Sequence, residues 1–294
     1  MANTVISYEE RRNRILGRLL IWPAAFWLVV FFALPLVVVL VYSFLTPDQV
    51  TQVKLPLTLD GYLKVADPVY TGVIVRSIMY AVETTVICLL LGYPLAFFVA
   101  TRPRSVRNFF LLLVVIPFWT NFLVRTYAWL FILSNNGLIN SLLVDTFNIL
   151  STPIKMINTP FAVVVGLIYG NLPFMILPIY ASVEKFNFRL VEAVHDLGGN
   201  DWHAFWRVVL PITMPGVVAG SILVFIPSLG AYVVPDMLGG TQGLMIGMQI
   251  TDAVRSLTRK PFGGALSIVM MVVVSIALLI YFRFSEQSQA NQGR

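Results

Sequence analysis

Six long apolar runs constrain this chain of 294 residues more than any other feature of its sequence. A helix needs about 20 mostly apolar residues to cross the roughly 30 Å hydrocarbon core of a bilayer. The runs that meet this requirement lie at about 19–45, 73–100, 109–133, 161–181, 210–234 and 264–284. The sequence therefore predicts an all-α membrane protein with six transmembrane helices.

The composition excludes several other classes of protein. Charged residues make up 12% of the chain and hydrophobic residues 58%, whereas soluble domains carry about 25% charged residues. So few charges could not cover the surface of an ordinary soluble enzyme. The one cysteine, Cys88, excludes an intrachain disulfide framework. The chain has a net charge of +6. In a membrane protein such an excess usually comes from basic cytoplasmic loops, so we expect no nucleic-acid partner.

Positive charge before the first run predicts the orientation. Four arginines precede this run, and Lys and Arg accumulate on the cytoplasmic side of membrane proteins. These residues are Arg11, Arg12, Arg14 and Arg18. With six spans, both termini are then cytoplasmic. We divide the chain into a cytoplasmic amphipathic segment at 1–18, a transmembrane domain at 19–284 and a cytoplasmic tail at 285–294.

Two charged residues fall well inside predicted spans, where ionised groups are costly and often functional. Glu83 and Arg125 lie about 15 and 12 Å from the outer ends of their helices. Adjacent antiparallel helices could join them in a buried ion pair. Alternatively, Glu83 faces a transport path and contacts a cationic substrate. Both interpretations remain open from the sequence.

Aromatic residues and one further carboxylate extend the set of possible path residues. Most membrane aromatics belong to interfacial belts or to packing, but some form surfaces that attract amines by cation–π contact. The candidates for a substrate path are Glu83, Trp119, Tyr127, Tyr169, Tyr232 and Asp236.

Glycines and prolines interrupt the fourth and fifth runs. Interior prolines remove helix hydrogen bonds, and small residues let membrane helices pack closely. The residues concerned are Gly166, Gly170, Pro173, Pro178, Pro215, Gly216, Gly220, Pro227 and Gly230. The pattern favours either close packing or a path whose shape changes, as in transporters.

A polar loop at 183–211 separates these two runs and predicts two short helices. The first spans about 188–197 and ends at Gly198 and Gly199, because glycine tolerates the left-handed backbone that follows a helix. Asn200 or Asp201 is suited to cap the second helix, which leads towards Pro211.

This loop resembles the EAA loop of the permeases of ABC importers. Their pattern is E-A-A, three residues, G, nine residues and I-x-L-P. The matching residues here are Glu192, Ala193, Val194, Gly198, Val208, Leu210 and Pro211, with valine replacing the second alanine and the isoleucine. Segments 117–129, 172–186, 196–220 and 236–240 are similar to the spermidine and putrescine permeases of this class.

The resemblance implies a type I ABC importer permease in the inner membrane of a bacterial cell. In that family the loop contacts an ATPase, so it implies ATPase coupling through Glu192, Ala193, Gly198, Leu210 and Pro211. It also implies a second permease subunit, two ATPase subunits and an extracytoplasmic solute-binding protein, with polyamine as substrate. Two alternatives remain: a permease for iron, sulfate or phosphonate, or a secondary transporter that works without ATP.

Several motifs are absent from the sequence. It contains no G-x-x-x-x-G-K-[ST] phosphate loop, no G-x-S-x-G and no H-E-x-x-H. We therefore expect no enzyme activity and no cofactor on this chain, and ATP–Mg belongs to the ATPase. His195 and His203 lack a clear third ligand, so we expect no metal site.

Overall fold

The computed structural model describes residues 22–48, 52–256 and 258–290. Six helices within these residues are long and apolar enough to cross a membrane, in agreement with the predicted number. They span Trp22–Phe44, Pro68–Ala100, Phe122–Thr146, Pro160–Glu184, Asp201–Leu229 and Lys260–Leu279. The predicted segment at 1–18 lies outside the described residues. The last helix continues to Ala290, within the predicted tail.

Two compact units divide the chain. The first comprises Met1–Val65 and Ala253–Val269, as far as they are described. It contains η1 (Val29–Ala33), α2 (Leu34–Phe44), β1 (Leu45–Asp48), β2 (Gln52–Leu57), α3 (Asp60–Val65), the end of α13 (Ile246–Arg255) and the start of α14 (Lys260–Ala290).

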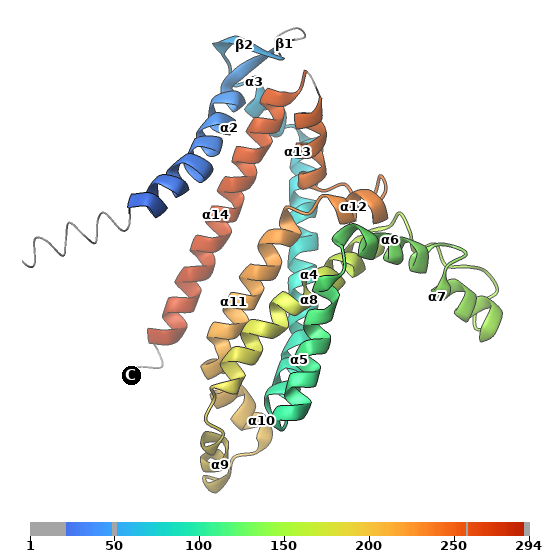
Figure 1. Ribbon diagram of the computed structural model, residues 1–294, viewed down its shortest axis with the longest axis vertical. Coiled ribbons are helices and arrows are strands. Elements are labelled where there is room, and N and C mark those ends of the chain that lie inside the picture. The colour runs from blue at the N-terminus through green and yellow to red at the C-terminus, as the bar shows by residue number, and fades with distance from the viewer. Residues whose placement is uncertain (1–21, 49–51, 257, 291–294) are drawn as a thin grey trace, which may run out of the picture. The chain divides into compact units, whose positions relative to one another are not determined.

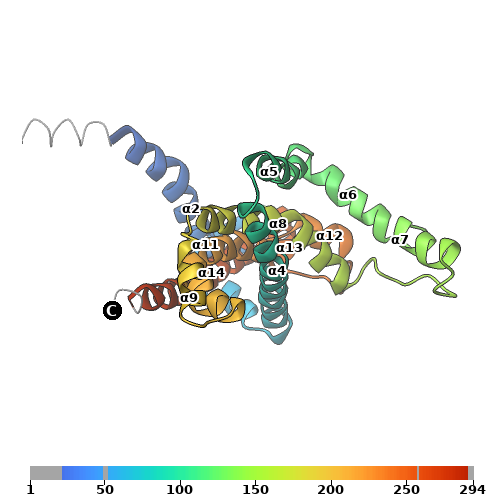
Figure 2. The same cartoon turned by 90° about the horizontal axis from the view of Figure 1, so that it is seen from below.

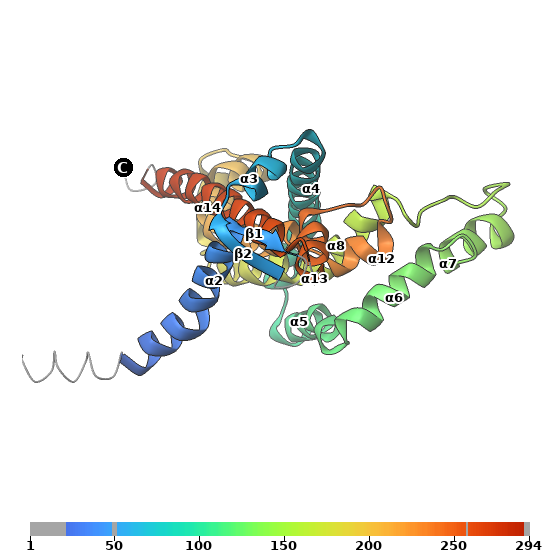
Figure 3. The same ribbon diagram turned by 90° about the horizontal axis from the view of Figure 1, so that it is seen from above.

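An antiparallel hairpin, absent from the sequence prediction, follows α2 in this unit. Figure 3 shows β1 beside β2, and Lys54 Nζ lies 3.2 Å from Asp48 Oδ1 across the pair. The Ser43 and Tyr62 hydroxyl oxygens are 2.7 Å apart and join α2 to α3. A Cβ on Gly264 would lie 3.1 Å from Ser43 Cα, so α14 approaches the α2 backbone closely.

The second unit comprises Ala66–Asp252 and Met270–Arg294. Helices α4, α8 and α11 pack together in it, and α9 and α10 lie at one end of this bundle (Figure 1). Its complete elements are α4 (Pro68–Ala100), α5 (Arg104–Trp119), α6 (Phe122–Leu133), α7 (Leu138–Asn140), η2 (Ser141–Thr146), α8 (Pro160–Glu184), α9 (Arg189–Asp196), α10 (Asp201–Ala204), η3 (Phe205–Val209), α11 (Leu210–Leu229) and α12 (Val233–Leu238). The unit also contains the start of α13 and the end of α14.

Small residues bring α8 and α11 into close contact. A Cβ on Gly220 would lie 3.0 Å from the carbonyl oxygen of Met175, and one on Gly216 would lie 2.6 Å from that of Pro178. Both helices remain continuous across their prolines. The structure therefore supports the packing interpretation of the glycines, as expected for membrane helices. A path whose shape changes remains a prediction.

The predicted third span at 109–133 is wrong as a single helix. Helix α5 ends at Trp119 and α6 begins at Phe122, and Figure 2 shows the two helices meeting at an angle. Thr120 has an extended backbone, with φ −82° and ψ 145°. The Asn121 side chain then accepts a hydrogen bond from Leu123 N and caps the new helix. Average hydropathy does not detect such a turn because the flanking residues are apolar.

The boundaries predicted for the fifth span, 210–234, are also wrong. The helix runs without a break from Asp201 through the π-helical η3 into α11 and ends at Leu229. Pro211 has no N–H and would clash with the preceding turn of an α-helix. The wider π-turn, with Leu210 N bonded to Phe205 O, lies directly before it.

Candidate functional site

The α8–α11 loop, defined here as residues 185–209, has the two short helices that the sequence predicts. Helix α9 spans Arg189–Asp196, close to the predicted 188–197. Gly198 follows with φ +80°, in the left-handed region that favours glycine. Gly199 N donates to Val194 O at 2.9 Å. Of the two predicted caps, Asn200 is the one that accepts from the backbone, at His203 N (2.9 Å). Local turn chemistry therefore determines this loop.

A contact between a histidine and a carboxylate crosses the turn. His195 Nε2 lies 3.0 Å from Asp201 Oδ1, which joins α9 to α10. His203 Nδ1 instead lies 2.6 Å from Asn200 Oδ1, so the two histidines have different partners. Within the described part of the chain, no three His, Cys, Asp or Glu side chains gather as metal ligands do.

The predicted residues of this loop divide into two groups. Glu192, Ala193 and Gly198 are exposed, as a docking surface requires. Leu210 and Pro211 are half-buried, and Leu210 packs against the bundle core. The first group is available to a partner, whereas the second fixes the loop to α11.

Large apolar side chains at the tip of the loop escaped the sequence analysis. Leu197 is 90% exposed, Trp202 67% and Trp206 50%. The rings of the two tryptophans meet edge to face, with centroids 5.5 Å apart. Tryptophans four residues apart lie on one helix face, and this spacing was the available signal. Together they give the exposed loop an apolar surface suited to contact another protein.

Two contacts tie the base of the loop to other helices. Arg107 Nη1 at the start of α5 lies 2.8 Å from Glu184 Oε1 at the end of α8. On α4, Tyr93 and the loop residue Phe205 meet edge to face, with centroids 5.6 Å apart. The loop is thus held from several helices, and not only by the two that it connects.

Arg125 forms no ion pair with Glu83 in this structure. Its Nη1 donates to Pro117 O at 2.9 Å, across the turn between α5 and α6. Its guanidinium also lies 5.6 Å from the ring centroid of Phe122 and 5.8 Å from that of Tyr169. The break in the third span frees backbone carbonyls, and Arg125 satisfies one of them. This position explains the charge without a carboxylate partner.

Glu83 is exposed on a mostly apolar face of α4, on which Arg76 lies two turns earlier. The exposed neighbours on this face are Val75, Met79, Val82, Val86 and Leu90. A carboxylate is costly against lipid, so this face favours a polar or protein environment around Glu83. The second interpretation of Glu83, a path residue, remains a prediction.

The other path candidates do not form one site in this structure. Trp119 and Tyr127 are exposed, at 78% and 61%. Tyr169 is brought to Arg125 and packs edge to face with Trp129, with centroids 5.4 Å apart. Tyr232 is half-buried at the start of α12, and Asp236 is exposed within α12. The cavity beside Arg125 and Tyr169 measures about 10 Å³ and is too small for a substrate.

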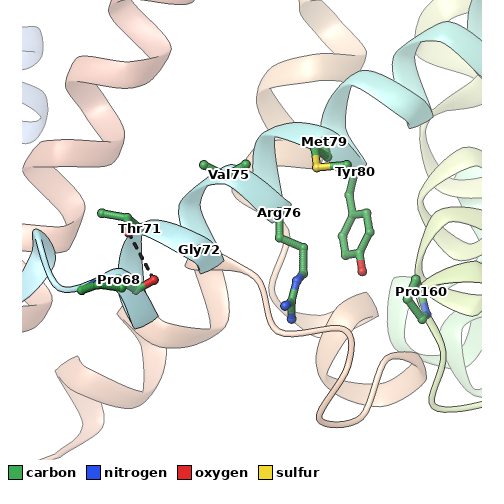
Figure 4. A pocket seen from close by; sticks show the side chains of 8 residues that line it. All are labelled: Pro68, Thr71, Gly72, Val75, Arg76, Met79, Tyr80 and Pro160. Atoms are coloured by element: carbon green, nitrogen blue, oxygen red, sulfur yellow. Dashed lines mark hydrogen bonds between the residues drawn. The ribbon is translucent and has the colours of Figure 1, made fainter.

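A larger pocket of about 580 Å³ lies along the first half of α4. In Figure 4, Arg76 and Tyr80 project from α4 on the side that faces Pro160. Both donate to the carbonyl oxygen of Gln242, at 3.3 and 3.5 Å. None of the residues predicted for the substrate path lines this pocket.

Comparison with known proteins identifies relatives along most of the chain. Residues 92–290 match the family described as "Binding-protein-dependent transport system inner membrane component". The chain is 42% identical over 259 residues to the spermidine/putrescine transport system permease protein PotB of Escherichia coli (strain K12), covering 88% of this chain and 94% of that protein. It is 42% identical over 257 residues to PotB of Haemophilus influenzae, covering 87% and 90%.

A solved structure resembles the fold. One chain of a bacterial alginate ABC transporter, determined with its alginate pentasaccharide-bound periplasmic protein, aligns with a TM-score of 0.73. The alignment covers 95% of this chain and 97% of that one, at 16% sequence identity. The likeness confirms the predicted fold class, that of an ABC importer permease.

Proposed function

Because the chain belongs to the family of inner membrane components of binding-protein-dependent transport systems, we propose that it is the permease through which an ATP-driven importer carries polyamines across the membrane. The observation that carries the proposal is the 42% identity to spermidine/putrescine permeases over 88% of the chain. A match of 259 residues in a chain of 294 includes the α8–α11 loop. The substrate class is therefore spermidine and putrescine.

The α8–α11 loop is the contact with the ATPase in this proposal. Its exposed surface combines the carboxylate of Glu192 with the apolar side chains of Leu197 and Trp202. The Asn200 cap and the His195–Asp201 pair hold α9 and α10 together, so a push on either helix moves both. ATP–Mg binds to the ATPase and supplies the energy. This chain contributes the lever and the moving path.

The complete importer contains three further kinds of subunit in this proposal. A second permease completes the path, two ATPase copies dock on the cytoplasmic loops, and a solute-binding protein delivers substrate on the outer side. The four arginines before the first span support a cytoplasmic N-terminus. Because ABC transport alternates between two packed arrangements, nucleotide must favour one of them.

Glu83 is the residue that we propose to meet the substrate. Polyamines carry ammonium groups, which need carboxylates and aromatic faces. Glu83 lies mid-span on an exposed face of α4, where the second permease would enclose it. Trp119 and Tyr127 are exposed aromatic faces in the same unit, and Asp236 offers a further carboxylate.

Stimulation of ATP hydrolysis in the reconstituted complex tests this function. The complex in lipid vesicles is given its binding protein loaded with spermidine, putrescine or sulfate. We expect stimulation and uptake with either polyamine and neither with sulfate. Stimulation by sulfate alone would reassign the substrate. Uptake that persists without ATP, with ion gradients intact, would contradict the coupling to an ATPase.

A further inference from the structure

Helix α4 contacts the α8–α11 loop although the two are far apart in the sequence. Tyr93 on α4 is 7% exposed, and its hydroxyl oxygen lies 2.9 Å from Thr213 Oγ1 on α11. The Tyr93 ring also meets Phe205, the first residue of η3, at an interplanar angle of 89°. One turn further along α4, Phe97 packs edge to face against Phe188, the residue that precedes α9, with centroids 6.1 Å apart. Both ends of the loop therefore contact the same part of α4.

The opposite half of α4 contacts a second connecting segment, the α12–α13 turn, defined here as residues 239–246. Ser77 is fully buried, and its Oγ accepts a hydrogen bond of 2.8 Å from Ile246 N, the first residue of α13. Arg76 Nη1 donates to Gln242 O within the turn at 3.3 Å (Figure 4 shows the Arg76 side chain). Polar side chains of α4 thus hold this turn by its backbone.

Tyr93 lies 16 positions after Ser77, which separates these two contact regions by about 24 Å of helix. Helix α4 is continuous from Pro68 to Ala100, and its Tyr93 and Cys88 belong to the core shared with α8 and α11. Pro94 lies inside α4 directly after Tyr93, and the helix remains continuous across it. Rigid packed elements of this kind carry energetic coupling between distant sites.

The π-helical η3 is the element of the α8–α11 loop that contacts Tyr93. Its backbone bonds span one residue more than those of an α-helix, as in the bond from Leu210 N to Phe205 O. π-turns inside helices frequently lie at functional sites. Because Phe205 is the first residue of η3 and its ring packs edge to face against that of Tyr93, a displacement of this end of the loop presses on Tyr93.

We propose that α4 transmits movement between the two segments: Tyr93 receives the displacement of the α8–α11 loop, and Ser77 passes it to the α12–α13 turn. The inference rests on the proposed function for the source of the displacement, which is the ATPase. Tyr93 and Ser77 are positioning residues, because they act through other residues and touch no substrate. Transmission of the loop's displacement thus includes α4 in addition to α8 and α11, the two helices that the loop connects.

The test measures the α12–α13 turn directly. Cys88 is the only cysteine of the chain, so a Cys88→Ser background with Gln242→Cys places one thiol in the turn. Gln242 is exposed and uses its backbone carbonyl in the contacts with Arg76 and Tyr80, which this substitution leaves intact. The rate of N-ethylmaleimide alkylation of this chain is measured in the complete complex, without nucleotide and with ATP–vanadate trapped.

We expect the two rates to differ several-fold in the background protein. Tyr93→Leu and Ser77→Ala should each bring their ratio close to one, while the complex still assembles and hydrolyses ATP. Tyr93→Phe separates the hydroxyl bond to Thr213 from the ring contact with Phe205, and its ratio should lie between those of the background and Tyr93→Leu. Phe98→Leu is the matched control, because Phe98 lies on α4 but meets Phe110 of α5. Its ratio should equal that of the background.

Three results would overturn the proposal: equal rates in the background protein, an unchanged ratio in both Tyr93→Leu and Ser77→Ala, or an equal loss in Phe98→Leu. Since α11 also leads to the turn through α12, an unchanged ratio would assign transmission to α11. Alkylation is measured without spermidine, and spermidine uptake is assayed separately. A complex that labels as expected but takes up no polyamine would refute the proposed substrate and leave the proposed transmission through α4 intact.

Discussion

His195 and Asp201 meet across the Gly198–Gly199 turn, with Nε2 and Oδ1 3.0 Å apart, and the contact is an ion pair when the imidazole is protonated. The pair joins the last turn of α9 to the first residue of α10. Both side chains are substantially exposed, at 45% and 94%, so the pair contributes little to global stability. Its effect is local: it fixes the angle between two helices that are otherwise connected by a few residues.

Asp201→Asn should therefore lower the number of substrate molecules taken up per ATP hydrolysed while leaving the folding of the chain unchanged. The Asn200 cap on His203 N remains in this variant, so α10 still forms. The measurement is the ratio of uptake to ATP hydrolysis in vesicles, together with the melting temperature of the complex.

Asp196→Asn is the matched control for this change. It removes the same charge from the same loop but lies outside the His195–Asp201 pair. An equal loss of coupling in both variants would mean that net charge, and not the pair, is responsible.

Gly198 permits a test of the turn geometry alone. Its φ is +80°, and a Cβ placed there would meet no atom within 4 Å. Gly198→Leu therefore introduces backbone strain of about 1–2 kcal/mol without a clash. We expect it to reduce uptake per ATP strongly. Gly198→Asn, which adopts this backbone region more readily, should retain most of the coupling. Equal ratios of uptake to ATP hydrolysis in both variants would contradict a role for the turn.

How far the sequence predicts this structure depends on the range of the interaction. The α8–α11 loop is predicted well because Gly198 and Asn200 act on their immediate neighbours. The number of spans follows from hydropathy alone. The turn at Thr120 was missed because apolar residues surround it on both sides. The contact of Tyr93 with Thr213 was missed for another reason: 120 residues separate them, and no local pattern encodes such a pairing.

Close packing of α8 on α11 predicts a steric effect at Gly216. A Cβ there would lie 2.6 Å from the carbonyl oxygen of Pro178 and also contact Ser182 Oγ, and a backbone atom cannot yield without moving the helix. Gly216→Ala should destabilise the chain by about 1–3 kcal/mol, measured by the thermal unfolding of the purified complex.

Gly170→Ala on α8 is the control for that substitution. A Cβ at Gly170 would meet nothing within 4 Å, and alanine favours the helix over glycine by up to about 1 kcal/mol. Gly170→Ala should therefore be neutral or slightly stabilising. A similar loss of stability in both variants would show that the interface does not set the cost.

Glu83 distinguishes a substrate contact from a structural charge. It has no ion pair with Arg125, whose guanidinium bonds to Pro117 O, so removing its charge leaves that arginine satisfied. Glu83→Gln should preserve the amount of protein in the membrane and weaken polyamine uptake by roughly tenfold or more, the value of a charge-assisted hydrogen bond. Glu83→Asp keeps the charge and should retain more activity than Glu83→Gln. The measurements are spermidine uptake and the amount of assembled complex. If Glu83→Gln and Arg125→Gln both fail to accumulate in the membrane, the carboxylate is structural and the path interpretation is wrong.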